Sequence, residues 1–251
     1  MFAGIKHKVR RHLGIRDLEK KLDKLSLVSG KIDEIYWAQV FNNTISGSSW
    51  LTKQAFSPGR WAAGYPFLYI LYRILNETKP QSILEFGLGE TTKLTYQYLC
   101  NVQTQQQKKL LVIEQDENWL RFFEQNFPGV SKNVLLREIG KGQVKGAEVF
   151  QYKDLLEGIG NQQFNLVLVD GPWGSPQYSR YQIVSLVEND KIAADFIIVI
   201  DDVNREGESM TLQEVKLALQ KKNIPFEEGV YQGVKDTAIL VSPQYKFLTS
   251  L

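Results

Sequence analysis

The sequence predicts an α/β fold in which helices cover both faces of a mostly parallel sheet. From residue 82 onwards, short apolar runs alternate with amphipathic segments of helical period. The runs are apolar throughout, which is typical of strands buried on both faces. We expect strands at 82–86, 110–114, 133–138, 164–169, 196–200, 225–230 and 237–242, and helices at 65–75, 91–99, 118–126, 176–189 and 208–221. The last two strands are joined by a short turn, which predicts an antiparallel hairpin.

Residues 1–50 predict a helical arm, and residues 51–251 a single larger domain. From Ile15 onwards, apolar side chains recur at steps of three and four, with Lys, Asp and Glu between them. The pattern fits one long helix or two helices broken near Gly30. Its apolar stripe could pack on the domain, or residues 15–35 could join copies of the chain into a homo-oligomer. The chemistry of the domain needs neither of these two contacts, so we expect residues 1–35 to be dispensable for cofactor binding.

Residues 1–13 combine an apolar side with a basic side. The apolar residues are Phe2, Ile5, Val9 and Leu13, and the basic ones are Lys6, Lys8, Arg10 and Arg11. This pattern suits peripheral contact with an anionic membrane surface. A frayed and solvated terminus is the alternative.

Composition narrows the function classes. A formal net charge of +2 over 251 residues, without a basic stripe, argues against nucleic acid as a partner. The single cysteine, Cys100, excludes an internal disulfide and a cysteine metal cluster. No run approaches the ~18 apolar residues of a membrane span, and no signal-peptide core follows Met1. We therefore expect a cytoplasmic protein whose membrane contact, if it has one, is peripheral and at the inner face.

A turn containing two glycines links the first expected strand to a helix. Glu85 lies in the strand, Gly87 and Gly89 in the turn and Thr91 at the start of the helix. The glycines permit a tight turn and let a ligand approach the backbone at the helix N-terminus. The third glycine of the dinucleotide fingerprint is missing, and Glu85 would repel a pyrophosphate but attract a cationic amino group. A turn without a ligand is the alternative.

A second carboxylate ends the next expected strand. Glu114 follows the apolar run at 110–113, where nucleotide-binding folds carry an acidic residue for the ribose hydroxyls. The alternative is a role at the start of the following helix, where acidic residues are favoured. We assign Glu114 to the ligand and Asp116 to the helix cap.

The segment from Glu85 to Thr91 resembles the first motif of class I S-adenosylmethionine-dependent methyltransferases, and Glu114 resembles their second motif. The resemblance implies a Rossmann-like, seven-stranded sheet with a reversed hairpin at one edge. It also implies S-adenosylmethionine as the cofactor, with Glu114 as the ribose ligand. The methionine end would lie in a cradle formed by Glu85, Gly87, Gly89 and Thr91, with Asp170 as a further contact.

Three carboxylates follow two of the expected strands. Asp170 comes directly after 164–169, and Asp201 and Asp202 come directly after 196–200. Because open parallel sheets bind ligands beyond the carboxyl ends of their strands, we expect these side chains to converge there. Like charges at close range are costly without a cation, and no lysine lies within these motifs to neutralise them. For Asp201 and Asp202, a capped turn before the next helix is the alternative.

The layout of these carboxylates resembles that of metal-dependent O-methyltransferases of the catechol and sugar types. The resemblance implies Asp170, Asp201 and Asp202 as ligands of a divalent cation, Mg²⁺ or Mn²⁺, that would lower the pKa of an acceptor hydroxyl. Pro172 departs from the catechol-type motif, which has a second acidic residue at that place. Both histidines lie in the arm, so deprotonation would depend on the metal or on a carboxylate such as Asp202.

Arginines complete the expected site. Arg180 follows the Asp170 motif, and Arg205 follows Asp202 by three residues. A guanidinium at either place could bind an acceptor carboxylate or phosphate through two hydrogen bonds, whereas solvated surface charge is the alternative. Arg60 is a weaker candidate. We expect Asp170, Asp202, Arg180 and Arg205 to take part in catalysis.

Together these features predict an S-adenosylmethionine-dependent O-methyltransferase that acts on a sugar, a glycan or another small polar acceptor with a hydroxyl. The acidic, aromatic and arginine residues suit such an acceptor better than a lipid or a nucleobase. Two alternatives stay open. One is a non-catalytic cofactor-binding module of a glycan assembly, and the other is an enzyme related to aminopropyl transferases, in which Asp170 would bind an amine.

Overall fold

A seven-stranded sheet forms the centre of the computed structural model, which describes residues 15–103 and 107–251. The strand order is β3-β2-β1-β6-β7-β9-β8. Neighbours from β3 to β7 are parallel, whereas β9 runs antiparallel to β7, and β8 antiparallel to β9. The strands are β1 (Ser82–Phe86), β2 (Lys109–Glu114), β3 (Val134–Leu136), β6 (Phe164–Val169), β7 (Ile192–Ile200), β8 (Glu227–Tyr231) and β9 (Thr237–Val241). The prediction of a mostly parallel, seven-stranded sheet with a reversed hairpin at one edge is confirmed.

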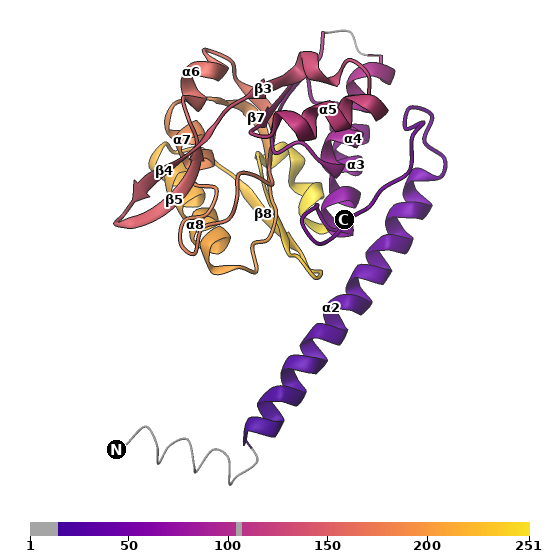
Figure 1. Ribbon diagram of the computed structural model, residues 1–251, viewed down its shortest axis with the longest axis vertical. Coiled ribbons are helices and arrows are strands. Elements are labelled where there is room, and N and C mark those ends of the chain that lie inside the picture. Colours follow the sequence, from indigo (N-terminus) through magenta and orange to yellow (C-terminus); the bar gives the residue numbers. More distant parts are fainter. Residues whose placement is uncertain (1–14, 104–106) are drawn as a thin grey trace.

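Helices pack on both faces of the sheet, so the strands contribute to two separate cores (Figure 1). One face is covered by α3 (Tyr65–Thr78), α4 (Glu90–Asn101) and α5 (Glu117–Asn126), and the other by α6 (Leu155–Ile159), α7 (Gln182–Glu188) and α8 (Glu206–Lys221). Ile83 of β1 belongs to the first core and Leu84 to the second, because successive side chains of a strand point to opposite faces. Burial on both faces explains why these strands are apolar at every position.

Three shorter elements lie outside this sheet. A hairpin of β4 (Ile139–Val144) and β5 (Ala147–Tyr152) is inserted between β3 and α6. Two 3-10 helices, η1 (Val130–Asn133) and η2 (Pro243–Ser250), precede β3 and follow β9.

The arm is one continuous helix, α2 (Ile15–Ile45), with no break at Gly30. Its C-terminal part packs on the domain: Phe41 is fully buried, and the indole N–H of Trp37 donates to the Gln232 carbonyl at 2.8 Å. Its N-terminal part extends away from the domain (Figure 1). The division of the chain at residue 50 stays a prediction, although Phe41 lies in the same core as α3.

The membrane contact expected of residues 1–13 lies outside the described residues. Within the described ranges, no helix combines the length and the apolar character that crossing a bilayer requires.

The helix predicted at 176–189 is wrong in its first part, because α7 begins only at Gln182. Tyr178 and Arg180 have φ values of +49° and +59°, which an α-helix does not allow. The N–H of Ser179 instead donates to the Gly207 carbonyl of α8 at 3.1 Å. This irregular path brings the buried Arg180 guanidinium beside acidic side chains, and that pairing overrides the helical tendency of the local sequence.

We predict that Phe41→Ala destabilises the domain whereas Lys20→Ala on the same helix does not. Phe41 is 0% exposed and packs edge-on against the rings of Phe56 and near Tyr65, so its removal should cost about 3–5 kcal/mol of unfolding free energy. Lys20 is exposed, so its truncation should change stability by less than about 0.5 kcal/mol. Urea unfolding of both variants measures the difference. Equal stabilities would show that α2 does not belong to the core.

Candidate functional site

The glycine turn lies at the carboxyl edge of the sheet, between β1 and α4. Gly87 has a φ of +92°, a conformation that favours glycine, and its N–H donates to the Ile113 carbonyl of β2 at 2.9 Å. A Cβ on Gly87 would lie 3.4 Å from the carbonyl oxygen of Asp170, so the turn packs directly on the chain after β6. A Cβ on Gly89 would meet nothing within 4 Å. The backbone at the N-terminus of α4 is therefore open to a ligand.

Glu85 lies beneath the glycine turn and not on its surface. The side chain is buried, and its carboxylate accepts hydrogen bonds from the hydroxyls of Thr91, Thr92 and Thr95 on α4. Burial raises the pKa of Glu85 to about 7, against the opposite effect of the three hydroxyl groups. The structure places Glu85 and Thr91 in a network that fixes α4 against β1. Their direct contact with a cofactor stays a prediction.

Glu114 connects the end of β2 to the glycine turn. One carboxylate oxygen accepts from the N–H of Leu88 at 2.9 Å, and the other accepts from Gln115 at 2.7 Å and Asp116 at 2.8 Å. The orientation of this buried carboxylate is therefore fixed by three backbone donors. Asp116 caps α5 by accepting from two of its first N–H groups, so that prediction is confirmed.

The three predicted carboxylates converge at the ends of β6 and β7. One ligand atom each from Asp170, Asp201 and Asp202 lies within 4.8 Å of the others. Asp201 and Asp202 are almost completely buried, and Asp170 is largely so. Asp202 has a φ of +63°, so the chain turns sharply directly after β7.

Two buried cations lie among these carboxylates. The Arg180 Nη2 is 3.3 Å from the Oδ1 of Asp170 and 3.4 Å from the Oδ2 of Asp202. The Lys235 Nζ is 3.4 Å from the Oδ2 of Asp201 and 3.6 Å from the Oδ2 of Asp202. No lysine lies within the two carboxylate motifs, but Lys235 reaches the carboxylates from the turn between β8 and β9.

The position of Lys235 next to the carboxylates follows from the order of the strands and not from any local sequence motif. Because β9 is antiparallel to β7, Ala238 pairs with Ile200, and the residues just before β9 lie beside Asp201. The hydroxyl of Thr237 also lies 3.5 Å from Asp201. Identifying Lys235 from the sequence would have required placing the reversed strand next to β7.

Buried negative charge exceeds buried positive charge in this cluster. Glu208 of α8 joins it, 3.8 Å from the Nε of Arg180, and accepts from the Ser179 hydroxyl at 2.9 Å. The carboxylates of Asp170, Asp201, Asp202 and Glu208 thus face the two buried cations Arg180 and Lys235. Arg205 adds a further cation 3.0 Å from Asp202, but its side chain is 54% exposed and solvent screens it.

The excess negative charge influences the pKa values of the carboxyl groups and the kind of cation that the cluster could bind. Burial, followed by the neighbouring charge of Asp201, raises the pKa of Asp170 well above its usual range, and burial also raises the pKa of Asp201. Among the described residues, the Oδ1 of Asp202 has no hydrogen-bond partner, and the Oδ1 of Asp170 has only its ion pair with Arg180. Surplus negative charge and an unpartnered carboxylate oxygen on Asp202 fit a hard divalent cation such as Mg²⁺.

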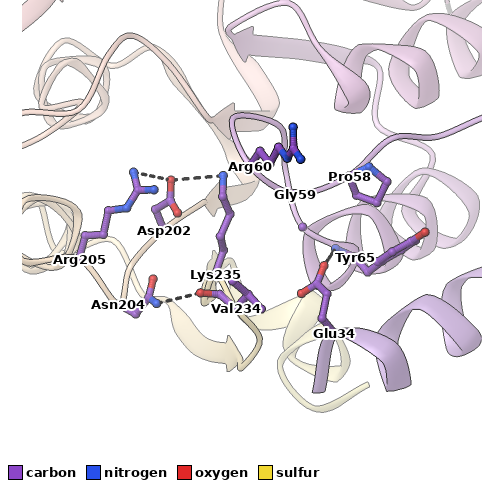
Figure 2. Close-up of a pocket in the computed structure, with 11 residues that line it drawn as sticks. Glu34, Pro58, Gly59, Arg60, Tyr65, Asp202, Asn204, Arg205, Val234 and Lys235 are labelled. Carbon is purple, nitrogen blue, oxygen red and sulfur yellow. Dashed lines mark hydrogen bonds and ion pairs between the residues drawn. The ribbon is translucent and has the colours of Figure 1, made fainter. Parts of the chain in front are cut away.

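A pocket of about 280 Å³ opens beside Asp202 (Figure 2). Figure 2 shows that Arg205 and Lys235 both pair with Asp202 at its wall. Arg60 lines the same pocket from the loop that precedes α3. Glu34 of α2 also lines it, and this contribution from the arm was not expected from the sequence. One Glu34 oxygen accepts from the Tyr65 N–H at 2.7 Å, and the other has no hydrogen-bond partner within the described ranges.

Tyr152 is a further buried polar residue that sequence analysis missed. Its side chain comes from the inserted hairpin, and a Cβ on Gly171 would lie only 2.7 Å from its hydroxyl oxygen. That hydroxyl has no hydrogen-bond partner in the part of the chain that the structure describes, and burial raises its pKa. No sequence pattern marks Tyr152, because the hairpin does not belong to the main sheet.

Comparison with known proteins yields distant likenesses in fold. No family model matches the chain, and no curated protein matches it in sequence. A Klebsiella pneumoniae protein with a suggested O-methyltransferase activity aligns over 83% of this chain and 98% of its own, at 17% identity and a TM-score of 0.48. TomG is an O-methyltransferase of Streptomyces achromogenes that is involved in tomaymycin synthesis and was solved with S-adenosylmethionine. It aligns over 83% of this chain and 98% of its own, at 16% identity and a TM-score of 0.49. The Podospora anserina methyltransferase PaMTH1, solved with S-adenosylhomocysteine, aligns over 89% of this chain and 96% of its own, at 12% identity and a TM-score of 0.45.

All three alignments are below 20% identity and have TM-scores below 0.5. At such identities the likeness concerns the fold, and function is inferred below from the residues of the site.

We predict that Glu85→Gln removes a pH dependence of stability. The native pKa of Glu85, about 7, lies above its ordinary value of 4.5, so between these values the native state binds more protons than the unfolded state. Unfolding free energy should therefore fall by about 3 kcal/mol as pH rises from 4.5 to 7, and this loss persists above pH 7. Denaturant unfolding at several pH values should show a flatter profile for Glu85→Gln. The exposed control Glu117→Gln should keep the wild-type slope, and an unchanged slope in Glu85→Gln would contradict the burial effect.

Proposed function

We propose that this protein is an S-adenosylmethionine-dependent methyltransferase that transfers a methyl group to a hydroxyl oxygen of a polar acceptor, a sugar or a glycan. One observation carries the proposal: the open glycine turn and the acidic cluster share one edge of the sheet. The Asp170 N–H donates to the Phe86 carbonyl at 3.2 Å, so the chain after β6 is fixed against the glycine turn. A cofactor on the turn would thus lie next to the carboxylates.

The cofactor would lie across the glycine turn, between the N-terminus of α4 and the end of β2. Its α-carboxylate suits the positive end of the α4 dipole at Gly89, where the backbone is open. Its ammonium and sulfonium charges suit the surplus negative charge around Asp170. Glu114, held by three N–H groups, is positioned to accept from the ribose hydroxyls. In this arrangement Glu85 and Thr91 support the turn from below.

The acceptor would occupy the pocket beside Asp202. Its wall mixes both charge signs through Glu34, Arg60, Arg205 and Lys235, which suits a ligand with many hydroxyl groups better than an apolar one. Trp61, next to Arg60 in the chain, is 97% exposed and offers a flat ring for stacking on a sugar. These features support a sugar or glycan as the acceptor.

In the reaction, the acceptor oxygen attacks the methyl carbon, the carbon–sulfur bond breaks, and S-adenosylhomocysteine leaves. The acceptor proton passes to a carboxylate, for which the unpartnered Oδ1 of Asp202 is suited. Arg180 keeps Asp170 and Asp202 oriented, and Arg205 binds Asp202 from the solvent side. A divalent cation, Mg²⁺ or Mn²⁺, held by Asp170, Asp201 and Asp202 would lower the pKa of the acceptor hydroxyl when bound.

Cofactor binding should depend on Glu114. Losing a hydrogen bond to a charged partner costs roughly 1.5–3 kcal/mol, so Glu114→Ala should bind S-adenosylmethionine about ten to a hundred times more weakly. Glu117→Ala, at an exposed site on α5, should bind like wild type. Calorimetric titration with S-adenosylmethionine and S-adenosylhomocysteine measures both. Wild-type affinity in a folded Glu114→Ala variant would remove this residue from the site.

Turnover should require a divalent cation. Protein treated with a chelator should still bind S-adenosylmethionine but form S-adenosylhomocysteine poorly on a panel of sugar acceptors, and Mg²⁺ or Mn²⁺ should restore the rate. Binding of Mn²⁺ alone, followed by electron paramagnetic resonance, provides a readout that does not depend on activity.

The matched variants for this test are at Asp201, directly after β7, and at Asp195, on β7 itself. Asp201→Asn should lose the bound Mn²⁺, whereas Asp195→Asn, exposed on the same strand, should keep it. Full activity in excess chelator, or Mn²⁺ binding unchanged by Asp201→Asn, would refute the metal role.

A further inference from the structure

The N-terminal part of α2 carries an apolar stripe that the domain does not cover. Leu18, Leu22, Leu25, Ile32 and Tyr36 run along one side of the helix, and Val28 and Ile35 lie beside them. These seven side chains are each between 51% and 69% exposed. Single exposed apolar residues are ordinary, but a continuous stripe of this size on a soluble surface marks an interaction site.

The stripe faces away from the domain. Phe41 lies on the side of α2 that contacts the domain, and with about 100° of rotation per residue Leu25 and Ile32 lie about 160° and 180° around the helix from it. Figure 1 shows the N-terminal part of the helix extending clear of the sheet and its covering helices. The stripe can therefore be covered only by something outside the described fold.

The size of the stripe matches a stable interface. Seven side chains that each hide roughly 100 Å² would bury about 700 Å² per helix, close to the ~800 Å² per partner of standard protein interfaces. The residue spacing along Leu18, Leu22, Leu25, Ser29, Ile32 and Tyr36 alternates four and three. That spacing is the a/d seam of a coiled coil, which is complementary to a second copy of itself.

The charges on the helix favour a protein partner over a membrane. Acidic and basic side chains share the exposed helix surface, with Asp17 and Glu19 followed by Lys20, Lys21 and Lys24. A helix that lies on an anionic bilayer carries a mainly basic polar face, whereas mixed signs are typical of the outer positions of a coiled coil.

We propose that α2 pairs with α2 of a second copy of this chain through the stripe from Leu18 to Tyr36. The domains would then lie on the outer sides of the helix pair, because each packs on the side of α2 opposite the stripe. Glu34, which lines the acceptor pocket, is on the same helix and directly precedes Ile35. Pairing would therefore hold in place the helix that contributes this pocket residue.

The test compares two double variants of the full chain. Leu22→Gln with Leu25→Gln removes the centre of the stripe, and Lys20→Gln with Lys24→Gln changes exposed residues off the stripe on the same helix. Sedimentation velocity over a range of micromolar concentrations measures the association, and circular dichroism checks that both variants keep their helices. The wild type and the lysine variant should be dimers, and the leucine variant should dissociate with a dissociation constant at least about a hundredfold higher.

Several results would overturn the proposal. A wild-type chain that stays monomeric at these concentrations has no such interface, and a leucine variant that dimerises like the wild type places the interface elsewhere. If the wild type is monomeric and binds anionic vesicles, and the leucine variant does not bind them, the stripe is a membrane contact. Loss of the dimer on deletion of residues 1–14 alone would assign the contact to that segment.

Discussion

The surplus of buried negative charge at the carboxyl ends of β6 and β7 is the constraint on which the site depends. Four carboxylates share this region with only two buried cations, Arg180 and Lys235. Removing like charges from water is costly unless each finds a partner, so the surrounding chain is arranged to supply partners. The left-handed backbone at Arg180 directs its guanidinium inward, and the reversed hairpin of β8 and β9 delivers Lys235. The remaining deficit of positive charge is the observation behind the proposed cation at this edge of the sheet.

The glycine turn also lies against buried carboxylates that need partners. Glu85 and Glu114 are both buried beneath or beside the turn, and both are satisfied by donors from the chain. Their hydrogen bonds fix the turn before any ligand arrives, which limits the entropy lost on binding. A ligand that carries positive charges, such as S-adenosylmethionine, would lie between these carboxylates and the acidic cluster. In the proposed function, the turn and the cluster would act as two halves of one site.

The sequence was sufficient to predict the fold class and the carboxylates that directly follow β6 and β7. Buried parallel strands are apolar at every position, so β1, β2 and β6 could be recognised within a residue of their ends. Asp170, Asp201 and Asp202 could be brought together because parallel strands end at the same edge. Asp116 could be recognised as a cap because the helix after it begins with exposed N–H groups.

Other features could not be predicted, because they depend on contacts between distant segments. The start of α7 depends on the pairing of Arg180 with carboxylates from two other strands, and Lys235 depends on the position of β9. Tyr152 belongs to a hairpin outside the sheet, and Glu34 reaches the pocket only because α2 packs on α3. α2 also continues through Gly30, although glycine disfavours a helix interior by about 1 kcal/mol.

A crystal structure of the protein grown with S-adenosylhomocysteine would test the account most directly. We predict that the amino acid end of the ligand lies over Gly89 at the N-terminus of α4, that its ribose contacts Glu114, and that its sulfur points toward Asp170. Ligand density at any other edge of the sheet would contradict the account. So would a protein that binds no S-adenosylhomocysteine while its glycine turn keeps the conformation described above.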